Sequence, residues 1–264
     1  MSSGWIRTAL AAVSLVAATA LAGCGTDTPK PAASGGGGGI SGEVTVFAAA
    51  SLTEAFTQIG KDFEAAHPGT KVTFNFGGSS GLATQITQGA PADVFASASP
   101  ATMKTVVDAG DAAGSPVVFA RNQLVIAVPK FNPRGLTELA NLGRPDVKVA
   151  LCAEQVPCGA AARKALAAAG VAVTPVTLEQ DVKAALQKVR LGEVDAALVY
   201  RTDTRASAAD VDSIEFPESA EAINDYPVVL LKGAPNKAAA QAFLEYLQTG
   251  PAKAVLSAAG FQAP

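Results

Sequence analysis

Strand-like apolar segments alternate with helical segments along most of this chain, and the alternation restricts the folds that it can adopt. The apolar run 44–48 precedes apolar residues at helical spacing over 52–63, and the alternating segment 72–76 precedes a Gly/Ser turn and a second helical pattern. The succession returns beyond residue 145, with a further strand predicted at 173–177. Repeated strand–turn–helix units predict an α/β protein with parallel sheets and a ligand site beyond the carboxyl ends of the strands.

Four of these turns start helices, near Ser51, Ser79, Cys158 and Val182. Each helix start offers free backbone N–H groups and a partial positive charge. Four such starts aimed at one point could hold a dianion without Lys or Arg. The pattern leaves open the alternative that Ser51 and Ser79 only cap their own helices.

The N-terminus carries the features of an export signal. Arg7 precedes an apolar run shorter than the ~20 residues that span a bilayer, and Leu21-Ala22-Gly23-Cys24 closes the run. This segment resembles a bacterial lipoprotein signal peptide at 1–23, which implies a lipid on Cys24 and a location on the extracytoplasmic face of the cell membrane. A plain signal peptide is the alternative. Residues 24–42 are rich in Gly, Pro and Ser and predict a flexible tether.

Charge and cysteine content narrow the function further. Loss of 1–23 would remove Arg7 and no acid, leaving 19 basic and 23 acidic side chains and a net charge of −4. No basic run is present, so we expect no nucleic-acid binding. The only histidine is His67, which argues against a zinc or copper site. With Cys24 reserved for lipid, Cys152 and Cys158 predict a disulfide in an oxidising compartment.

Six sequence blocks stand in the order and spacing found in the periplasmic molybdate-binding proteins (ModA family) of ABC importers. They are Val46 to Thr53, Phe76 to Leu82 with Gln85-Ile86, Gly89 to Phe95, Val156 to Gly159, Asp181-Val182, and Val199-Tyr200. The chain resembles this family from about residue 43 to its C-terminus.

This resemblance implies a two-lobed type II periplasmic-binding-protein fold with the ligand in the interdomain cleft. Lobe I is expected at 43–122 and 224–264, and lobe II at 123–223. The implied donors to the ligand are the hydroxyls and N–H groups of Ser51 and Ser79, the N–H groups of Cys158 and Val182, and the phenol of Tyr200. We expect a monomer without cofactor or catalytic activity that delivers molybdate or tungstate to the membrane permease of an ABC importer.

The implied ligand set contains hydrogen-bond donors and no acceptor. Molybdate, tungstate and sulfate are bare dianions at neutral pH, whereas phosphate carries a proton that would point at another donor, a mismatch that costs about 1–3 kcal/mol. Sulfate shares the chemistry of molybdate, so only the size of the cavity can reject it. A receptor for sulfate or another small anion therefore stays open as an alternative.

A serine hydrolase is the second alternative, because Gly77-Gly78-Ser79-Ser80-Gly81 fits the G-x-S-x-G pattern of a nucleophile elbow. That elbow requires a histidine after the serine in the chain, and His67 precedes Ser79. The sequence therefore favours a binding protein over an enzyme.

Overall fold

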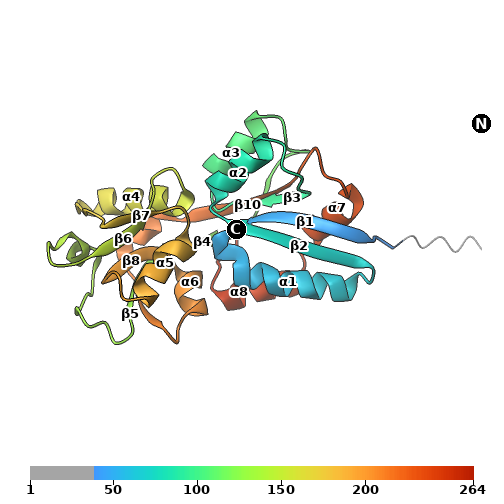
Figure 1. Ribbon diagram of the computed structural model, residues 1–264. Coiled ribbons are helices and arrows are strands. Elements are labelled where there is room, and N and C mark those ends of the chain that lie inside the picture. The colour runs from blue at the N-terminus through green and yellow to red at the C-terminus, as the bar shows by residue number, and fades with distance from the viewer. Residues whose placement is uncertain (1–38) are drawn as a thin grey trace, which may run out of the picture. The chain divides into compact units, whose positions relative to one another are not determined.

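A computed structural model describes residues 39–264 of the chain (Figure 1). The predicted signal peptide at 1–23, the predicted lipidation site Cys24 and most of the predicted tether lie outside the described residues. The described part begins inside the range predicted as tether, since Ile40 packs against the hydrophobic core and the first strand starts at Gly42.

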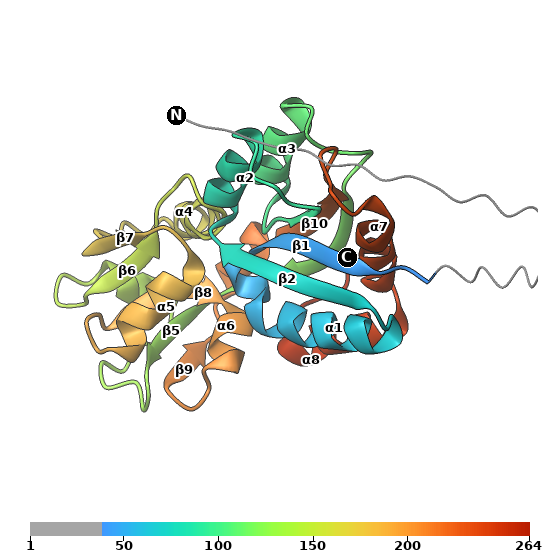
Figure 2. The ribbon, with the colours of Figure 1, turned by 45° about the vertical axis from the view of Figure 1, so that its right-hand side comes forward.

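Two sheets form the centres of two lobes, as Figures 1 and 2 show. Each sheet has five strands. The sheet of lobe I has the order β2-β1-β3-β10-β4, and the sheet of lobe II has the order β7-β6-β8-β5-β9. The strands are β1 (Gly42–Ala49), β2 (Thr70–Gly77), β3 (Val94–Ala96), β4 (Val117–Asn122), β5 (Leu124–Pro129), β6 (Val149–Cys152), β7 (Thr177–Glu179), β8 (Ala196–Tyr200), β9 (Val211–Ile214) and β10 (Asn224–Leu230).

Helices cover both faces of each sheet. The α-helices are α1 (Thr53–Ala66), α2 (Ser79–Thr87), α3 (Pro100–Asp108), α4 (Pro157–Ala169), α5 (Val182–Arg190), α6 (Arg201–Ala206), α7 (Lys237–Tyr246) and α8 (Gly250–Ala259). Three short 3-10 helices are η1 (Ala50–Leu52), η2 (Leu139–Gly143) and η3 (Pro217–Ala222). None of the helices within 39–264 is long and apolar enough to cross a bilayer.

The hydrophobic cores follow this layering. In lobe I, α1, α7 and α8 pack on one face of the sheet, and α2 and α3 pack on the other. In lobe II, β8 is buried along its whole length between α4 and α5. A strand buried on both faces reads as a continuous apolar run, which is the pattern that the sequence shows there.

Both sheets are mixed, so the prediction of parallel sheets is wrong in part. β1 runs parallel to β2 and β3, but β10 runs antiparallel to β3 and β4. In lobe II, β5 runs antiparallel to β8 and β9. One strand in each sheet runs against the common direction of the others, β10 in lobe I and β5 in lobe II. Each follows a crossing of the chain between the sheets, so it enters its sheet from the opposite direction.

The strand predicted at 173–177 also lies elsewhere, because β7 spans Thr177–Glu179. Pro175 has no N–H to donate to a neighbouring strand, and the first bond to β6 comes from the N–H of Val176, which donates to the carbonyl of Val149 at 2.9 Å. The apolar residues before this proline therefore pack as an extended approach to the sheet.

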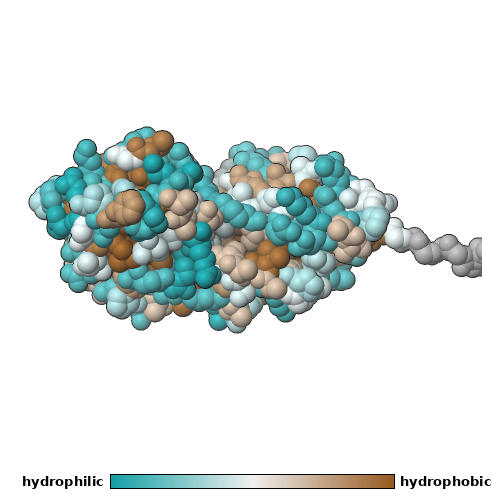
Figure 3. All heavy atoms as spheres, turned by 90° about the horizontal axis from the view of Figure 1, so that it is seen from below, coloured by the Kyte–Doolittle hydropathy of each residue, from teal (hydrophilic) through white to brown (hydrophobic). Residues whose placement is uncertain are grey.

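The chain crosses between the sheets twice, from β4 to β5 around Gln123 and from η3 to β10 around Ile223. We adopt 43–122 with 224–264 and 123–223 as our proposal for the two lobes. A space-filling view shows two rounded masses that meet at a narrower waist (Figure 3).

Candidate functional site

A small cavity lies between the two lobes. The space open to the centre of a water molecule is about 20 Å³. The wall is formed by Ala49, Ala50, Ser51, Gly77, Gly78, Ser79, Ala98, Val156, Pro157, Cys158, Asp181, Val182 and Tyr200. The structure thus brings together all five residues that the sequence resemblance assigned to the ligand.

Strand-to-helix turns build most of the wall. Three of these turns follow β1, β2 and β7, and a fourth turn precedes α4. Helices α2, α4 and α5 begin at the wall, at Ser79, Pro157 and Val182. Three helix N-termini therefore meet at the cavity, where their free N–H groups and partial positive charge favour an anion.

The two serines do not cap helices, so the capping alternative is wrong. Ser51 lies inside η1, and Ser79 is the first residue of α2, whose N-cap position is Gly78. Neither α1 nor α2 has a side-chain cap hydrogen bond. Ser51 is 3% exposed and Ser79 is 1% exposed. Both hydroxyls are therefore buried and remain available to hydrogen-bond a ligand in the cavity.

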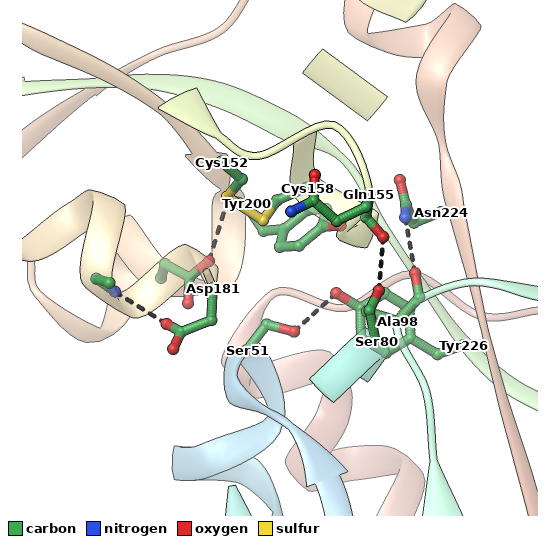
Figure 4. Close-up of a disulfide and its surroundings, with 12 residues drawn as sticks. Ser51, Ser80, Ala98, Cys152, Gln155, Cys158, Asp181, Tyr200, Asn224 and Tyr226 are labelled. Carbon is green, nitrogen blue, oxygen red and sulfur yellow. Dashed lines mark hydrogen bonds between the residues drawn. A yellow bond between two sulfur atoms is a disulfide. The ribbon is translucent and has the colours of Figure 1, made fainter. Parts of the chain in front are cut away.

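Each serine hydroxyl has one partner among the described residues, and Figure 4 shows the partner of Ser51. The Ser51 Oγ lies 2.8 Å from the hydroxyl of Tyr226. The Ser79 Oγ accepts a hydrogen bond of 3.0 Å from the N–H of Ala98. In both cases the partner leaves room for a further hydrogen bond to a ligand, since a hydroxyl has one proton and two lone pairs.

Tyr200 supplies a third side-chain donor. It ends β8, is 1% exposed, and its hydroxyl has no hydrogen-bond partner among the described residues. Burial, together with the neighbouring Tyr226, raises the pKa of Tyr200 well above its usual value. The phenol therefore keeps its proton at neutral pH and can donate it to a ligand.

A disulfide holds the turn before α4. Cys152 at the end of β6 and Cys158 in the first turn of α4 are joined, with their Cα atoms 5.7 Å apart. Gly159 follows, and a Cβ atom there would collide with the carbonyl of Ala153. The close turn and the covalent link fix the position of the Cys158 N–H at the cavity.

Three contacts join the lobes around the cavity. The Ser80 hydroxyl in lobe I donates to the carbonyl of Gln155 in lobe II at 2.6 Å. Lys183 on α5 donates to the carboxylate of Glu54 on α1 at 2.7 Å. Gly78 approaches the carbonyl of Gln180 so closely that a Cβ atom would collide with it. The lobes are therefore closed in this structure.

The wall of the cavity carries no cationic side chain. Its one charged residue is Asp181, whose carboxylate caps α5 by accepting from the N–H of Ala184 at 2.9 Å. The backbone and neutral hydroxyls must therefore supply the attraction for a ligand. The cap on α5 is a feature that the sequence reasoning missed, although Asp at an N-cap is a common helix signal.

A buried carboxylate lies behind Tyr200. Asp203 is fully buried and its Oδ2 accepts from the Tyr200 N–H at 3.1 Å, while Oδ1 lies 3.2 Å from Lys183 Nζ without hydrogen-bond alignment. Burial raises the pKa of Asp203 to about 6, and Lys183 offsets part of this effect. Burial lowers the pKa of Lys183, but Asp203 and Glu54 outweigh it and the net pKa is raised.

The geometry gives no support to a hydrolase or a metal centre. His67 lies at the C-terminal end of α1, about 20 Å along the helix from its start beside the cavity, and its ring packs 4.5 Å from that of Phe63. Among residues 39–264 no group of three His, Cys, Asp or Glu side chains could hold a metal ion.

Comparison with known proteins agrees with this geometry. The family described as "Bacterial extracellular solute-binding protein" matches residues 44–262. A molybdate-binding protein of Mycobacterium tuberculosis is 42% identical over 98% of this chain and 99% of its own. A putative ABC transporter substrate-binding lipoprotein of Bacillus subtilis is 33% identical over 83% of this chain and 86% of its own.

A solved structure gives the same architecture. The substrate-binding domain of a putative molybdenum ABC transporter from Clostridium difficile superposes with a TM-score of 0.63 at 27% identity, over 84% of this chain and 99% of that domain. Family, fold and cavity agree, and the chain therefore belongs to the bacterial extracellular solute-binding proteins, which bind solutes and are not enzymes.

Proposed function

We propose that this protein captures molybdate between its lobes and delivers it to the membrane permease of an ABC importer. The observation that carries the proposal is the cavity itself, whose wall offers hydroxyls, backbone N–H groups and helix N-termini but no cation. The donors are Ser51, Ser79, Cys158, Val182 and Tyr200. The anion is a cargo, and no cofactor takes part.

The size of the cavity supports a compact inorganic ligand. Sites for organic ligands usually enclose about 300–1,000 Å³. One water molecule needs ~15 Å³ of space open to its centre. With about 20 Å³ of space open to the centre of a water molecule, the closed site is too small for a sugar or an amino acid. A tetrahedral oxyanion fits this description, and tungstate, which resembles molybdate in size and charge, is expected to bind as well.

The five proposed ligand groups are all hydrogen-bond donors, which supports selection against protonated anions. An anion that keeps a proton at neutral pH places a donor opposite a donor, and each such mismatch costs about 1–3 kcal/mol. Phosphate is disfavoured on this ground. Sulfate is a bare dianion, so its rejection depends on its smaller size and the longer hydrogen bonds that it would make.

The lipid anchor is the second part of the proposal. The Leu21-Ala22-Gly23-Cys24 segment supports a lipid on Cys24, and the similar B. subtilis protein carries "lipoprotein" in its name. We propose that the mature protein is a lipid-anchored monomer on the extracytoplasmic face of the cell membrane. Mass spectrometry of the membrane-extracted protein should find a diacylated N-terminal Cys24, and an unmodified residue at this position would contradict the anchor.

Calorimetric titration tests the ligand. The folded part of the chain should bind molybdate and tungstate tightly, sulfate more weakly, and phosphate weakest of all. Strong binding of sulfate with weak binding of molybdate would replace this proposal by the sulfate-receptor alternative. Absence of binding by every oxyanion would remove it.

A further inference from the structure

A line of buried polar groups extends behind Ser51, away from the cavity. The first is Tyr226 on β10, the second is Asn122 at the end of β4, and the third is Thr202 on α6. Their exposed fractions are 0%, 1% and 5%. Polar groups in such a place need internal partners, so their hydrogen bonds define which atom gives the proton and which accepts it.

The direction of the line is set at Asn122. Its Oδ1 accepts from the N–H of Gln123 at 3.0 Å, so the amide nitrogen faces the other way. That Nδ2 lies 2.9 Å from the Thr202 Oγ1 and 3.5 Å from the Tyr226 hydroxyl. An amide nitrogen only donates, so the Tyr226 oxygen must accept from it.

The proton of Tyr226 then has one destination. Among the described residues, the Tyr226 hydroxyl makes hydrogen bonds only with Asn122 and with the Ser51 Oγ at 2.8 Å. The neighbouring Tyr200 hydroxyl does not reach hydrogen-bond geometry, so Tyr226 donates to Ser51 (Figure 4). Burial raises the pKa of Tyr226 and keeps this proton in place at neutral pH. The Ser51 oxygen accepts, and its own proton is left for the cavity.

We propose that Tyr226, oriented by Asn122, is a positioning residue that fixes Ser51 as a hydrogen-bond donor and so selects unprotonated dianions. The inference rests on the proposed function of the cavity. The N–H of Ala98 donates to the Ser79 Oγ and so fixes Ser79 as a donor in the same way. Both serines therefore present a proton to the ligand, and neither readily accepts a proton from it. Without the Tyr226 hydroxyl, Ser51 could turn its proton away and accept from a protonated anion.

A double-mutant cycle tests the link between the two hydroxyls. Tyr226→Phe should weaken molybdate binding roughly 3- to 10-fold and reduce the ratio of molybdate to phosphate affinity at pH 7.5, read by titration and by competition. The loss should vanish in a Ser51→Ala background and persist in a Ser79→Ala background. A loss of the same size in both backgrounds would mean that Tyr226 has only a structural role and would overturn the inference.

Controls separate this inference from folding and from the proposed function. Phe at position 226 keeps the ring that contacts Tyr200, Phe119 and Phe261, and thermal unfolding without ligand should show a folded protein. Tyr246→Phe, at a half-buried tyrosine of α7 outside the cavity wall, should leave affinity and selectivity unchanged. If wild type fails to bind molybdate, the proposed function is wrong; if it binds and the cycle shows no coupling, only the role of Tyr226 is wrong.

A second variant serves if Tyr226→Phe does not fold. In Asn122→Asp the carboxylate would accept the Tyr226 proton and withdraw it from Ser51. This variant keeps the tyrosine yet should show the same loss of affinity and the same coupling to Ser51→Ala. An unchanged molybdate-to-phosphate ratio in the folded variant would overturn the inference.

Discussion

Ser79 occupies the first position of α2, and its hydroxyl accepts from the protein through a backbone N–H rather than through another side chain. Ser79→Ala should therefore remove one donor to the anion, and it also leaves the buried N–H of Ala98 without its acceptor. Hydrogen bonds to charged partners contribute about 1.5–3 kcal/mol, so we expect molybdate affinity to fall roughly 10- to 150-fold by calorimetry. Ser257→Ala, an exposed serine on α8, is the matched control. An affinity within twofold of wild type for Ser79→Ala would show that this hydroxyl does not contact the ligand.

Asp203 makes binding depend on pH on the acidic side. Its pKa lies at about 6 because of burial, with Lys183 as a partial offset, and the adjacent Tyr200 lines the cavity. A bound dianion raises that pKa further, so binding takes up a proton and affinity rises as pH falls from about 7 towards 5.5. Above about pH 7 the affinity should be flat, because hydroxyls and backbone groups do not titrate there.

The control for this pH dependence is Asp203→Asn, whose side chain keeps a carbonyl oxygen for the Tyr200 N–H. Calorimetry at constant ionic strength should show a flat profile in that variant over the whole range. A steep fall in wild-type affinity as pH rises through about 7 to 8.5 would instead indicate a titrating cation in the site.

Residues of the site differ in how far the sequence could reveal them. The helix starts in the sequence pointed to Ser51 and Ser79, and the family resemblance added Tyr200 to the same site. Tyr226 and Asn122 lie in apolar strands, where the pattern indicates burial but not a partner. Their hydrogen bond joins positions 104 residues apart, so only the tertiary fold brings them together.

At the level of elements, the turn between β2 and α2 decides whether the lobes can meet. Gly78 in this turn contacts the Gln180 carbonyl of the opposite lobe, where a Cβ atom would collide with backbone. Gly78→Ala should therefore hold the lobes apart and weaken molybdate binding at least about tenfold, the effect of ~1.4 kcal/mol, with little change in thermal stability without ligand.

Gly81→Ala is the matched control for this turn, because a Cβ atom at Gly81 meets nothing within 4 Å. It lies inside α2, where alanine is favoured over glycine, so affinity should stay constant and stability should rise slightly. Wild-type affinity in Gly78→Ala would mean that the bound state does not need this approach of the two backbones.

The elements themselves were predictable to different degrees. Long amphipathic segments such as α1 and α5 form helices that begin close to the predicted starts near Ser51 and Val182, because several turns of apolar periodicity specify a helix. The six residues of α6 are too few to show such a period, so the apolar pattern carries no signal for this helix. Strand direction also escaped prediction, since it depends on where the chain crosses between lobes.

For the whole molecule, the cross-lobe contacts imply a change of shape on binding. Proposed donors come from both lobes, with Ser51 and Ser79 on one and Cys158, Val182 and Tyr200 on the other, so the anion should draw the lobes together. Small-angle scattering should give a smaller radius of gyration with molybdate than without it. Gly78→Ala should show no such compaction, and an unchanged radius in wild type with proven binding would contradict lobe closure.

The burial of the cavity wall also has a consequence for exchange kinetics. The five proposed donors are at most 3% exposed, so a captured anion cannot depart past them while the lobes stay together. Residence time is then governed by how often the lobes part, and an excess of unlabelled anion in solution cannot hasten the loss of a labelled one. Anions of unequal affinity therefore differ in residence time only as far as they alter the frequency of opening. A transporter that forces the lobes apart would then set the rate at which the anion is released.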